Sequence, residues 1–202
     1  MRDTRLRETK RVDLRLKTET RAAYECPKRQ VQLGEQRDSP AHQWITQVAR
    51  GELEKEAVLM EDSDFLLLPD THKRNDWRTG EARVVNLLIV FKDLSLHTIR
   101  DLRAEHLPVL HRIQTDVLER VEVLAGVPAA ELYCYFNYQP SNPLLLHMHV
   151  SWPLPANRDS TRHHLLHTVC FNLGLHGEYY RDCPLATTVS RRIECEADGQ
   201  GI

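Results

Sequence analysis

Residues 143–152 read Pro-Leu-Leu-Leu-His-Met-His-Val-Ser-Trp and hold two histidines in alternation inside an otherwise apolar run. Side chains two residues apart on a β-strand point to the same face of a sheet. We therefore expect His147 and His149 to project together, while Leu146, Met148 and Val150 project into a core. Because imidazoles are costly to hold beside a core, the pair indicates a site where a ring nitrogen attacks a substrate or binds a metal.

The local sequence leaves three interpretations of the histidine pair open. A zinc site would need a third ligand, and no Asp, Glu or Cys lies close in the sequence. Two satisfied histidines in a core or an interface are the ordinary alternative in a chain with 11 histidines. The third interpretation is nucleophilic catalysis, in which a neutral imidazole attacks phosphorus and a neighbouring group fixes its tautomer.

The composition is that of a globular protein. The chain has 202 residues, 28% of them charged, and a formal net charge of -2, which argues against a surface that coats nucleic acid. Its five cysteines form no C-x-x-C pair, which is typical of free thiols in a reducing compartment. The first residues lack an apolar signal segment, and the apolar run at 84–91 is too short to span a bilayer. We expect a soluble intracellular protein.

The chain divides into a charged N-terminal segment (1–40), a compact domain (41–190) and a polar tail (191–202). Hydrophobic periodicity predicts helices at 42–50, 94–124 and 161–173. It predicts strands at 56–60, 65–68, 83–91, 132–138, 144–152 and 186–189. The nearly continuous apolar run within 83–91 indicates a strand buried on both faces. This order of elements predicts an α+β domain with a mainly antiparallel sheet.

Seven stretches occur in order between residues 13 and 166: Asp-Leu-Arg-Leu (13–16), Gln-Trp-Ile (43–45), Phe-Leu-Leu-Leu-Pro-Asp (65–70), Ile-Arg-Asp-Leu-Arg-Ala-Glu-His-Leu-Pro-Val-Leu (99–110), Tyr-Gln-Pro-Ser (138–141), His-Met-His-Val (147–150) and Arg-His-His-Leu-Leu (162–166). Together they resemble scavenger mRNA-decapping enzymes, a family of the histidine-triad (HIT) superfamily. The resemblance implies a HIT-like fold, an antiparallel sheet packed with one long and one shorter helix, and a homodimer. It also implies that 1–40 is a remnant of the family's N-terminal domain and linker.

The resemblance further implies a reaction. The family hydrolyses the residual mRNA cap, methylguanosine joined by a triphosphate to a nucleoside, and releases methylguanosine monophosphate through a covalent nucleotidyl-histidine. The implied partners are a capped dinucleotide or a short capped RNA, with no DNA, membrane, metal or cofactor, in the cytoplasm, the nucleus or both.

The family's motif has three alternating histidines, and this chain has two. In one register Leu145 replaces the first histidine, His147 is the nucleophile and His149 is the third. In the other register His147 is the first, His149 is the nucleophile and Ser151 replaces the third. We prefer His147 as the nucleophile, because that register needs a smaller insertion after Ser141.

Three residues match those that hold the methylated base in the family. Trp44 corresponds to the stacking aromatic residue, and an indole face suits a cationic base. Glu54 corresponds to the carboxylate that pairs with the guanine edge, and Asp70 to an aspartate that contacts the base. The ordinary alternatives are a core tryptophan, a solvated glutamate and the charge of a strand-ending turn.

The phosphate-binding residues are less completely matched. Where the family has a lysine after its Pro-Asp pair, this chain has His72, followed by Lys73. Arg162 matches an arginine at the start of the last long helix, where a guanidinium and a helix N-terminus both favour phosphate. Asn137 stands where the family has a further histidine, and Ser141 is expected to face the phosphate chain.

Hydrolysis of the residual cap is the leading prediction. The alternatives are a catalytically weakened cap-binding or regulatory protein, and a broader hydrolase of dinucleoside polyphosphates or nucleotide phosphoramidates. The incomplete histidine motif is the feature that keeps these alternatives open.

Overall fold

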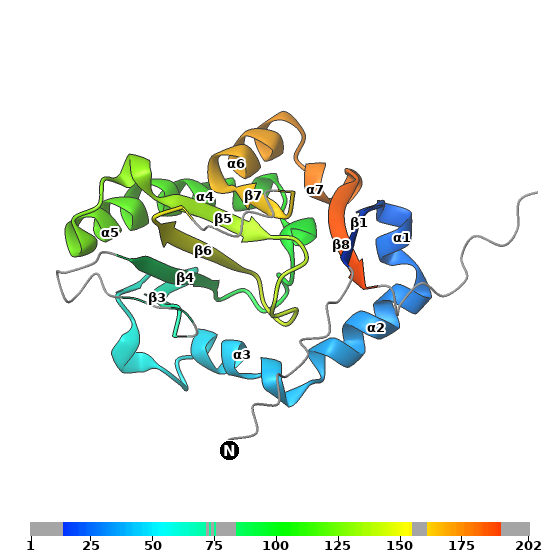
Figure 1. Ribbon diagram of the computed structural model, residues 1–202, viewed down its shortest axis with the longest axis horizontal. Coiled ribbons are helices and arrows are strands. Elements are labelled where there is room, and N and C mark those ends of the chain that lie inside the picture. Colours follow the sequence, from blue (N-terminus) through cyan, green and yellow to red (C-terminus); the bar gives the residue numbers. More distant parts are fainter. Residues whose placement is uncertain (1–13, 72, 74, 76–83, 155–160, 191–202) are drawn as a thin grey trace, which may run out of the picture.

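The fold is built on a six-stranded antiparallel sheet (Figure 1). A computed structural model describes residues 14–71, 73, 75, 84–154 and 161–190. The strands lie in the order β2 (Met60–Glu61), β3 (Phe65–Pro69), β4 (Val85–Phe91), β6 (His147–Trp152), β5 (Tyr133–Asn137) and β7 (His163–Leu165). The predicted α+β fold, with an antiparallel sheet packed against one long and one shorter helix, is confirmed.

One face of the sheet carries the main core. A long helix runs through α4 (Leu107–Arg112), a π-helical turn (Ile113–Val117) and α5 (Leu118–Ala125), and it ends at Gly126, whose φ is 65°. Its apolar stripe packs with α6 (Leu166–Leu175) against the sheet. The members of this core from β6 are Met148 and Val150. They alternate with the histidines as predicted.

The opposite face is covered in part by α3 (Trp44–Ala49). Ile45 and Val48 of this helix are buried against Leu66, Leu68, Leu88, Val90 and Leu145. Val90 pairs with His147 and Leu88 with His149 across β4 and β6, so both histidines lie on this face. The predicted burial of β4 on both faces is confirmed, since its residues contribute to both apolar clusters.

A two-stranded ribbon joins the two ends of the described chain. In it β1 (Leu14–Glu19) pairs with β8 (Leu185–Ser190), and the helices α1 (Arg21–Glu25) and α2 (Pro27–Arg37) follow β1 (Figure 1). A last short helix, α7 (Tyr179–Asp182), precedes β8. Glu19 of β1 and Arg100 are both buried where the ribbon meets the domain. The proposed division at residue 40 stays a prediction.

Four predicted elements were wrong at their boundaries. The helix predicted at 94–124 begins only at Leu107, after two 3₁₀ turns at Ile99–Asp101 and Ala104–His106. Residues 55–57 form a 3₁₀ turn, and the strand predicted at 56–60 is reduced to the two residues of β2. The strand predicted at 144–152 begins only at His147. The helix predicted at 161–173 begins at Leu166, because residues 163–165 pair with β5 as a strand. An edge strand of three residues is too short to produce a readable period.

Three further observations complete the fold. Cys134 and Cys170 are buried free thiols, and free thiols are what the cysteine spacing predicts. Single 3₁₀ turns lie at Pro40–His42, Lys55–Ala57, Ile99–Asp101, Ala104–His106 and Ala129–Glu131. Within the described ranges, none of the helices has the length and apolar character needed to cross a membrane.

Candidate functional site

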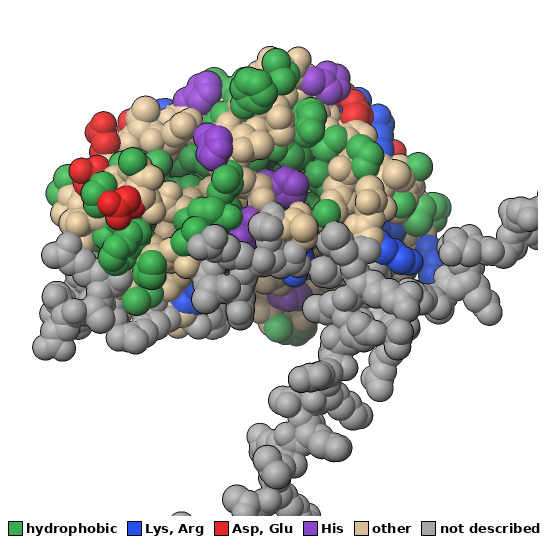
Figure 2. All heavy atoms as spheres, turned by 45° about the horizontal axis from the view of Figure 1, so that its top comes forward, with side chains coloured by type: hydrophobic (Ala, Val, Ile, Leu, Met, Phe, Trp, Pro, Cys, Tyr) green, Lys and Arg blue, Asp and Glu red, His purple; other side chains and the backbone are tan. Residues whose placement is uncertain are grey.

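The two histidines of β6 form the centre of the candidate site. His147 and His149 are 4% and 5% exposed, and their ring centroids lie 5.4 Å apart in an edge-to-face arrangement. Figure 2 shows several histidine side chains among hydrophobic ones on one face of the molecule. Two buried imidazoles on one strand face need specific partners, because an unpaired buried ring nitrogen costs free energy.

His147 is held by the backbone of its own strand. Its Nδ1 lies 3.0 Å from the carbonyl oxygen of Leu145, to which Nδ1–H donates. With the proton on Nδ1, a neutral ring presents its lone pair on Nε2. Burial lowers the pKa of His147, and the Leu145 carbonyl and Asp70 oppose this effect only in part. His147 is therefore a neutral imidazole with an available nitrogen at neutral pH.

His149 has the complementary arrangement. The Lys73 ammonium lies 3.3 Å from His149 Nδ1 and donates to it, so the neutral ring carries its proton on Nε2. This Nε2 is buried and has no hydrogen-bond partner among the described residues. Burial is the main cause that lowers the pKa of His149 to about 2, with further contributions from His147, Lys73 and His163. Among the described residues, the site thus offers a lone pair on His147 Nε2 and a buried N–H donor on His149 Nε2 that has no partner.

Asp70 positions the lysine that holds His149. Its carboxylate oxygen Oδ2 lies 3.1 Å from Lys73 Nζ and 3.8 Å from His149 Nδ1. The turn after β3 creates this arrangement, since Lys73 N–H donates to the Asp70 carbonyl and Asp70 N–H donates to the carbonyl of Asn86. The structure therefore brings together four residues that the sequence had assigned to catalysis, the base and the phosphates. His72, also assigned to the phosphates, lies outside the described residues.

Tyr135 and His163 belong to the site and were not predicted. Tyr135 pairs with His149 across β5 and β6, and their ring centroids are 5.2 Å apart. The ring of His163, on β7, stacks on Tyr135 at 4.1 Å. The period-two spacing of Tyr133, Tyr135 and Asn137 was the available signal for this face of β5. His163 falls within the helix predicted at 161–173, and this is wrong because the residue lies on β7.

Ser151 lies on the same face of β6 as His147 and His149. Its hydroxyl is buried and lies 3.3 Å from the side-chain oxygen of Asn86, to which it donates. Burial raises the pKa of the Tyr135 phenol, and a side-chain hydrogen bond with Ser151 opposes this effect in part. With these two polar neighbours, Ser151 supports the strand beside the histidines.

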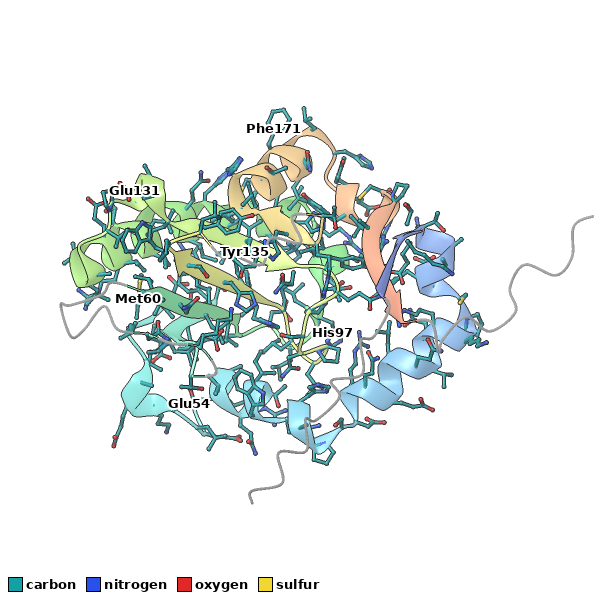
Figure 3. The ribbon with its side chains drawn as sticks, in the orientation of Figure 1. Glu54, Met60, His97, Glu131, Tyr135 and Phe171 are labelled. Atoms are coloured by element: carbon teal, nitrogen blue, oxygen red, sulfur yellow. The ribbon has the colours of Figure 1, made fainter. Side chains whose placement is uncertain are left out.

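Trp44 and Glu54 lie on the α3 side of the sheet. Trp44 is half-buried against the cluster that contains Leu145, two residues before His147. Glu54 has a φ of 56°, an uncommon conformation for a residue with a side chain and one that concentrates at functional sites. Its Oε2 is buried and, among the described residues, without a hydrogen-bond partner. Figure 3 places Glu54 beside α3 and Tyr135 on β5.

Three other residues were predicted to contact phosphate: Asn137, Ser141 and Arg162. Arg162 Nη2 donates to the Gln139 carbonyl at 2.8 Å, and its Nε donates to the Tyr138 carbonyl at 3.2 Å. The prediction that Arg162 starts a helix was wrong, because it lies just before β7. Asn137 pairs with His163 at the end of β5, on the face of the histidines. Ser141 is exposed in the loop before β6. Their roles at phosphate stay predictions.

The described part of the chain contains no group of three or more His, Cys, Asp or Glu side chains that could hold a metal ion. The chemistry that the described residues offer is therefore that of two neutral imidazoles, one ammonium and one carboxylate. Such a set can attack a phosphorus atom, donate hydrogen bonds to phosphate oxygens and balance their negative charge.

Replacing Lys73 with methionine should lower kcat/KM for a phosphate-ester substrate by about tenfold to a hundredfold at pH 7, because a charge-assisted hydrogen bond to His149 is lost. The positive charge of Lys73 lowers the pKa of both histidines. Without that charge, both pKa values rise, and protonation of His147 removes its lone pair at a higher pH. The acid limb of the pH profile of kcat/KM should therefore move to higher pH.

Lys73→Arg is the matched control, since arginine keeps the positive charge. It should leave the acid limb near its original position even if the rate falls. An acid limb that moves equally in both variants would show that the charge of Lys73 does not govern the histidines.

Comparison with known proteins gives the family. A family model described as "Scavenger mRNA decapping enzyme C-term binding" matches residues 43–164. An "m7GpppX diphosphatase" from Schizosaccharomyces pombe is 29% identical over 115 residues, which cover 55% of this chain and 36% of that protein. One from Ascaris suum is 27% identical over 163 residues, covering 78% and 52%, and the human protein is 27% identical over 151 residues, covering 69% and 42%.

The chain thus spans between about a third and a half of the length of these curated relatives. A solved HIT family hydrolase from Legionella pneumophila Philadelphia 1 is 18% identical, with a TM-score of 0.43, over 56% of this chain and 95% of that chain. The family model covers more than half of the 202 residues, from the start of α3 into β7. The chain therefore belongs to the family of the scavenger mRNA-decapping enzyme's C-terminal domain.

Proposed function

We propose that this protein hydrolyses a residual mRNA cap, as a capped dinucleotide or a short capped RNA, to methylguanosine monophosphate and a nucleoside diphosphate. The single observation that supports this most is the opposed tautomers of the two histidines. His147 donates from Nδ1 to Leu145 and keeps Nε2 free to attack, whereas His149 keeps an unsatisfied Nε2–H. The names of the relatives, m7GpppX diphosphatases, supply the substrate class.

In the first step His147 Nε2 attacks the phosphorus next to methylguanosine. An N–P bond forms as the bond from that phosphorus to the bridging oxygen breaks, and the electron pair leaves with the nucleoside diphosphate. His149 Nε2–H donates a hydrogen bond to the phosphate oxygens and to the developing charge on the leaving group. Water then attacks the same phosphorus, which releases methylguanosine monophosphate and restores the neutral His147 ring.

The base and the phosphate chain would lie on one face of the sheet. Trp44 stacks on the cationic base, and Glu54 offers its unpaired carboxylate oxygen to the N–H donors of the guanine edge. Lys73 attracts the phosphates through its positive charge, and Asp70 contacts the base. Both residues lie close to His149. The phosphate chain then runs across β6, where Asn137, Ser141 and Arg162 are its remaining proposed contacts.

As part of the same proposal, the protein forms a homodimer and acts in the cytoplasm, the nucleus or both. Phe171 and Leu175 of α6 are 65% and 70% exposed, next to the exposed polar residues His167 and Thr168 of the same helix. Large apolar side chains exposed together, rimmed by polar ones, are typical of surfaces that a partner covers. Figure 3 shows Phe171 pointing away from the domain, which gives a second copy an apolar surface to cover.

Leu145 supports a second candidate, a cap-binding protein that has lost catalysis. It stands where the family has its first histidine, and it is fully buried against α3. We expect the natural chain to convert a methylguanosine-capped dinucleotide, analysed by chromatography of its products, and Leu145→His to change the rate by less than about tenfold. Leu145→Gln, a polar variant without an imidazole, controls for the cost of a buried polar group.

If the natural chain only binds the capped dinucleotide and Leu145→His creates turnover, the chain is a binder with a weakened site. An unmethylated dinucleotide measured in parallel separates the third alternative. Equal kcat/KM values for the two substrates would identify a broader dinucleoside polyphosphate hydrolase.

A further inference from the structure

The side-chain amide of Asn75 replaces a backbone hydrogen bond where β3 and β4 separate. The Asp70 N–H, just after β3, donates to the Asn86 carbonyl at 2.9 Å. In a regular antiparallel pair the Asn86 N–H would donate back to the Asp70 carbonyl. It donates instead to Asn75 Oδ1 at 2.6 Å, and Asn75 Nδ2 donates to the Asp70 carbonyl at 3.1 Å. The amide of Asn75 therefore lies between these two backbone groups and satisfies both.

Asn75 also holds the end of the turn that carries Lys73. Its Nδ2 lies 3.5 Å from the Lys73 carbonyl oxygen, and the Lys73 N–H donates to the Asp70 carbonyl at 3.0 Å. The orientation of the amide is fixed, because a backbone N–H can only donate and a carbonyl can only accept. The Lys73 side chain is 39% exposed, and an exposed lysine has many rotamers to choose from. The backbone of this turn therefore decides whether the ammonium reaches His149.

Lys73 and Asp70 compete for one nitrogen of His149. The Lys73 ammonium donates to Nδ1 at 3.3 Å, whereas Asp70 Oδ2, 3.8 Å from the same nitrogen, can only accept. With the ammonium in place, the neutral ring carries its proton on Nε2. If the ammonium moved away, the carboxylate would accept a hydrogen bond from a protonated Nδ1, and Nε2 would lose its proton. The position of Lys73 thus selects the tautomer of His149.

We propose that Asn75 is a positioning residue, which fixes the turn from Asp70 to Lys73 and thereby keeps the ring proton of His149 on Nε2. This rests on the proposed function, in which the Nε2–H of His149 donates to the phosphate oxygens. Asn75 acts through Lys73, since its own hydrogen bonds go to backbone groups of the turn and of β4.

The tautomer of His149 can be measured without substrate. In NMR spectra of ¹⁵N-labelled protein at neutral pH, the natural chain should show His149 with a protonated Nε2 and an unprotonated Nδ1. Asn75→Leu keeps the approximate volume but has no hydrogen-bonding group. It should move the Nδ1 resonance toward that of a protonated nitrogen, as Lys73→Met should. An unchanged tautomer in Asn75→Leu would overturn the proposal.

Two further variants make this measurement specific. Asn75→Asp keeps the acceptor for the Asn86 N–H but has no donor for the two carbonyls, so it should change the tautomer as Asn75→Leu does. Asn172→Leu is the matched control, since Asn172 is also half-buried and donates to the Tyr180 hydroxyl at 3.0 Å, on α6. It should leave the tautomer of His149 unchanged. The same tautomer change in Asn172→Leu would contradict a specific role for Asn75.

Turnover of a capped dinucleotide tests the same coupling. Asn75→Leu should lower kcat/KM about tenfold in the natural chain, but less than about twofold in the Lys73→Met variant, where no ammonium is left to position. Equal losses in the two backgrounds would show that Asn75 does not act through Lys73 and would also overturn the proposal. If the natural chain leaves the capped dinucleotide intact, the proposed hydrolysis is wrong, and the tautomer of His149 still decides on Asn75.

Discussion

Replacing His147 with asparagine is expected to lower kcat for a capped dinucleotide by at least roughly a thousandfold, because the variant has no ring nitrogen to attack phosphorus. The fold should persist. The asparagine amide N–H can replace the donor that His147 offers to the Leu145 carbonyl, 3.0 Å from Nδ1. Stopped assays that follow methylguanosine monophosphate measure the rate, and thermal unfolding of the same preparations checks the fold.

The matched control is His149→Asn, two residues along the same strand and equally buried. This variant loses the donor to phosphate but keeps the nucleophile, so kcat should fall by roughly a hundredfold. If His149→Asn abolishes turnover and His147→Asn only slows it, the roles are reversed. Ser151 would then occupy the third position of the motif.

Replacing Arg100 with methionine is expected to lower the free energy of unfolding by about 3–5 kcal/mol, the scale for breaking a buried ion pair by removal of one partner. The Arg100 guanidinium is 2% exposed and donates to the Tyr138 hydroxyl and to the Glu19 carbonyl, each at 2.7 Å. It also donates to the Tyr180 carbonyl at 3.2 Å, and so connects the ribbon of β1 and β8 to the domain. Chemical denaturation followed by circular dichroism measures the loss.

Two further variants make this result specific. Lys17→Met, on the exposed side of β1, removes a charge from the same ribbon and should leave the unfolding midpoint unchanged. Glu19→Gln, made together with Arg100→Met, should recover part of the lost stability, because it neutralises the carboxylate that Arg100 no longer balances. A loss below about 1 kcal/mol for Arg100→Met would show that this buried group does not hold the ribbon to the domain.

The sequence was sufficient for the parts of the site that follow a regular period. The alternation of His147 and His149 predicted their shared face, and the apolar run of β4 predicted burial on both sides. Tyr135 follows the same alternation, but it was not predicted as a site residue, because tyrosine is common in strands. His163 was assigned to a helix, since a three-residue edge strand next to a helix carries no readable period.

The contacts that fix the histidines' protons could not be predicted. Lys73 and His149 are 76 positions apart, and only the pairing of β3, β4 and β6 brings them to 3.3 Å. The buried pair of Arg100 and Glu19 likewise depends on where the ribbon of β1 and β8 packs against the domain. For Trp44 and Glu54 the only signal was the family resemblance, because locally they read as a core residue and a surface charge.

The most direct measurement of the central claim is the site of the covalent intermediate. A capped dinucleotide mixed with the His149→Asn variant, quenched in alkaline denaturant and digested, should yield a peptide that carries methylguanosine monophosphate. Mass spectrometric fragmentation should place this group on His147. Methylguanosine monophosphate attached to His163 or another histidine, or turnover with no attached nucleotide at any quench time, would contradict attack by His147.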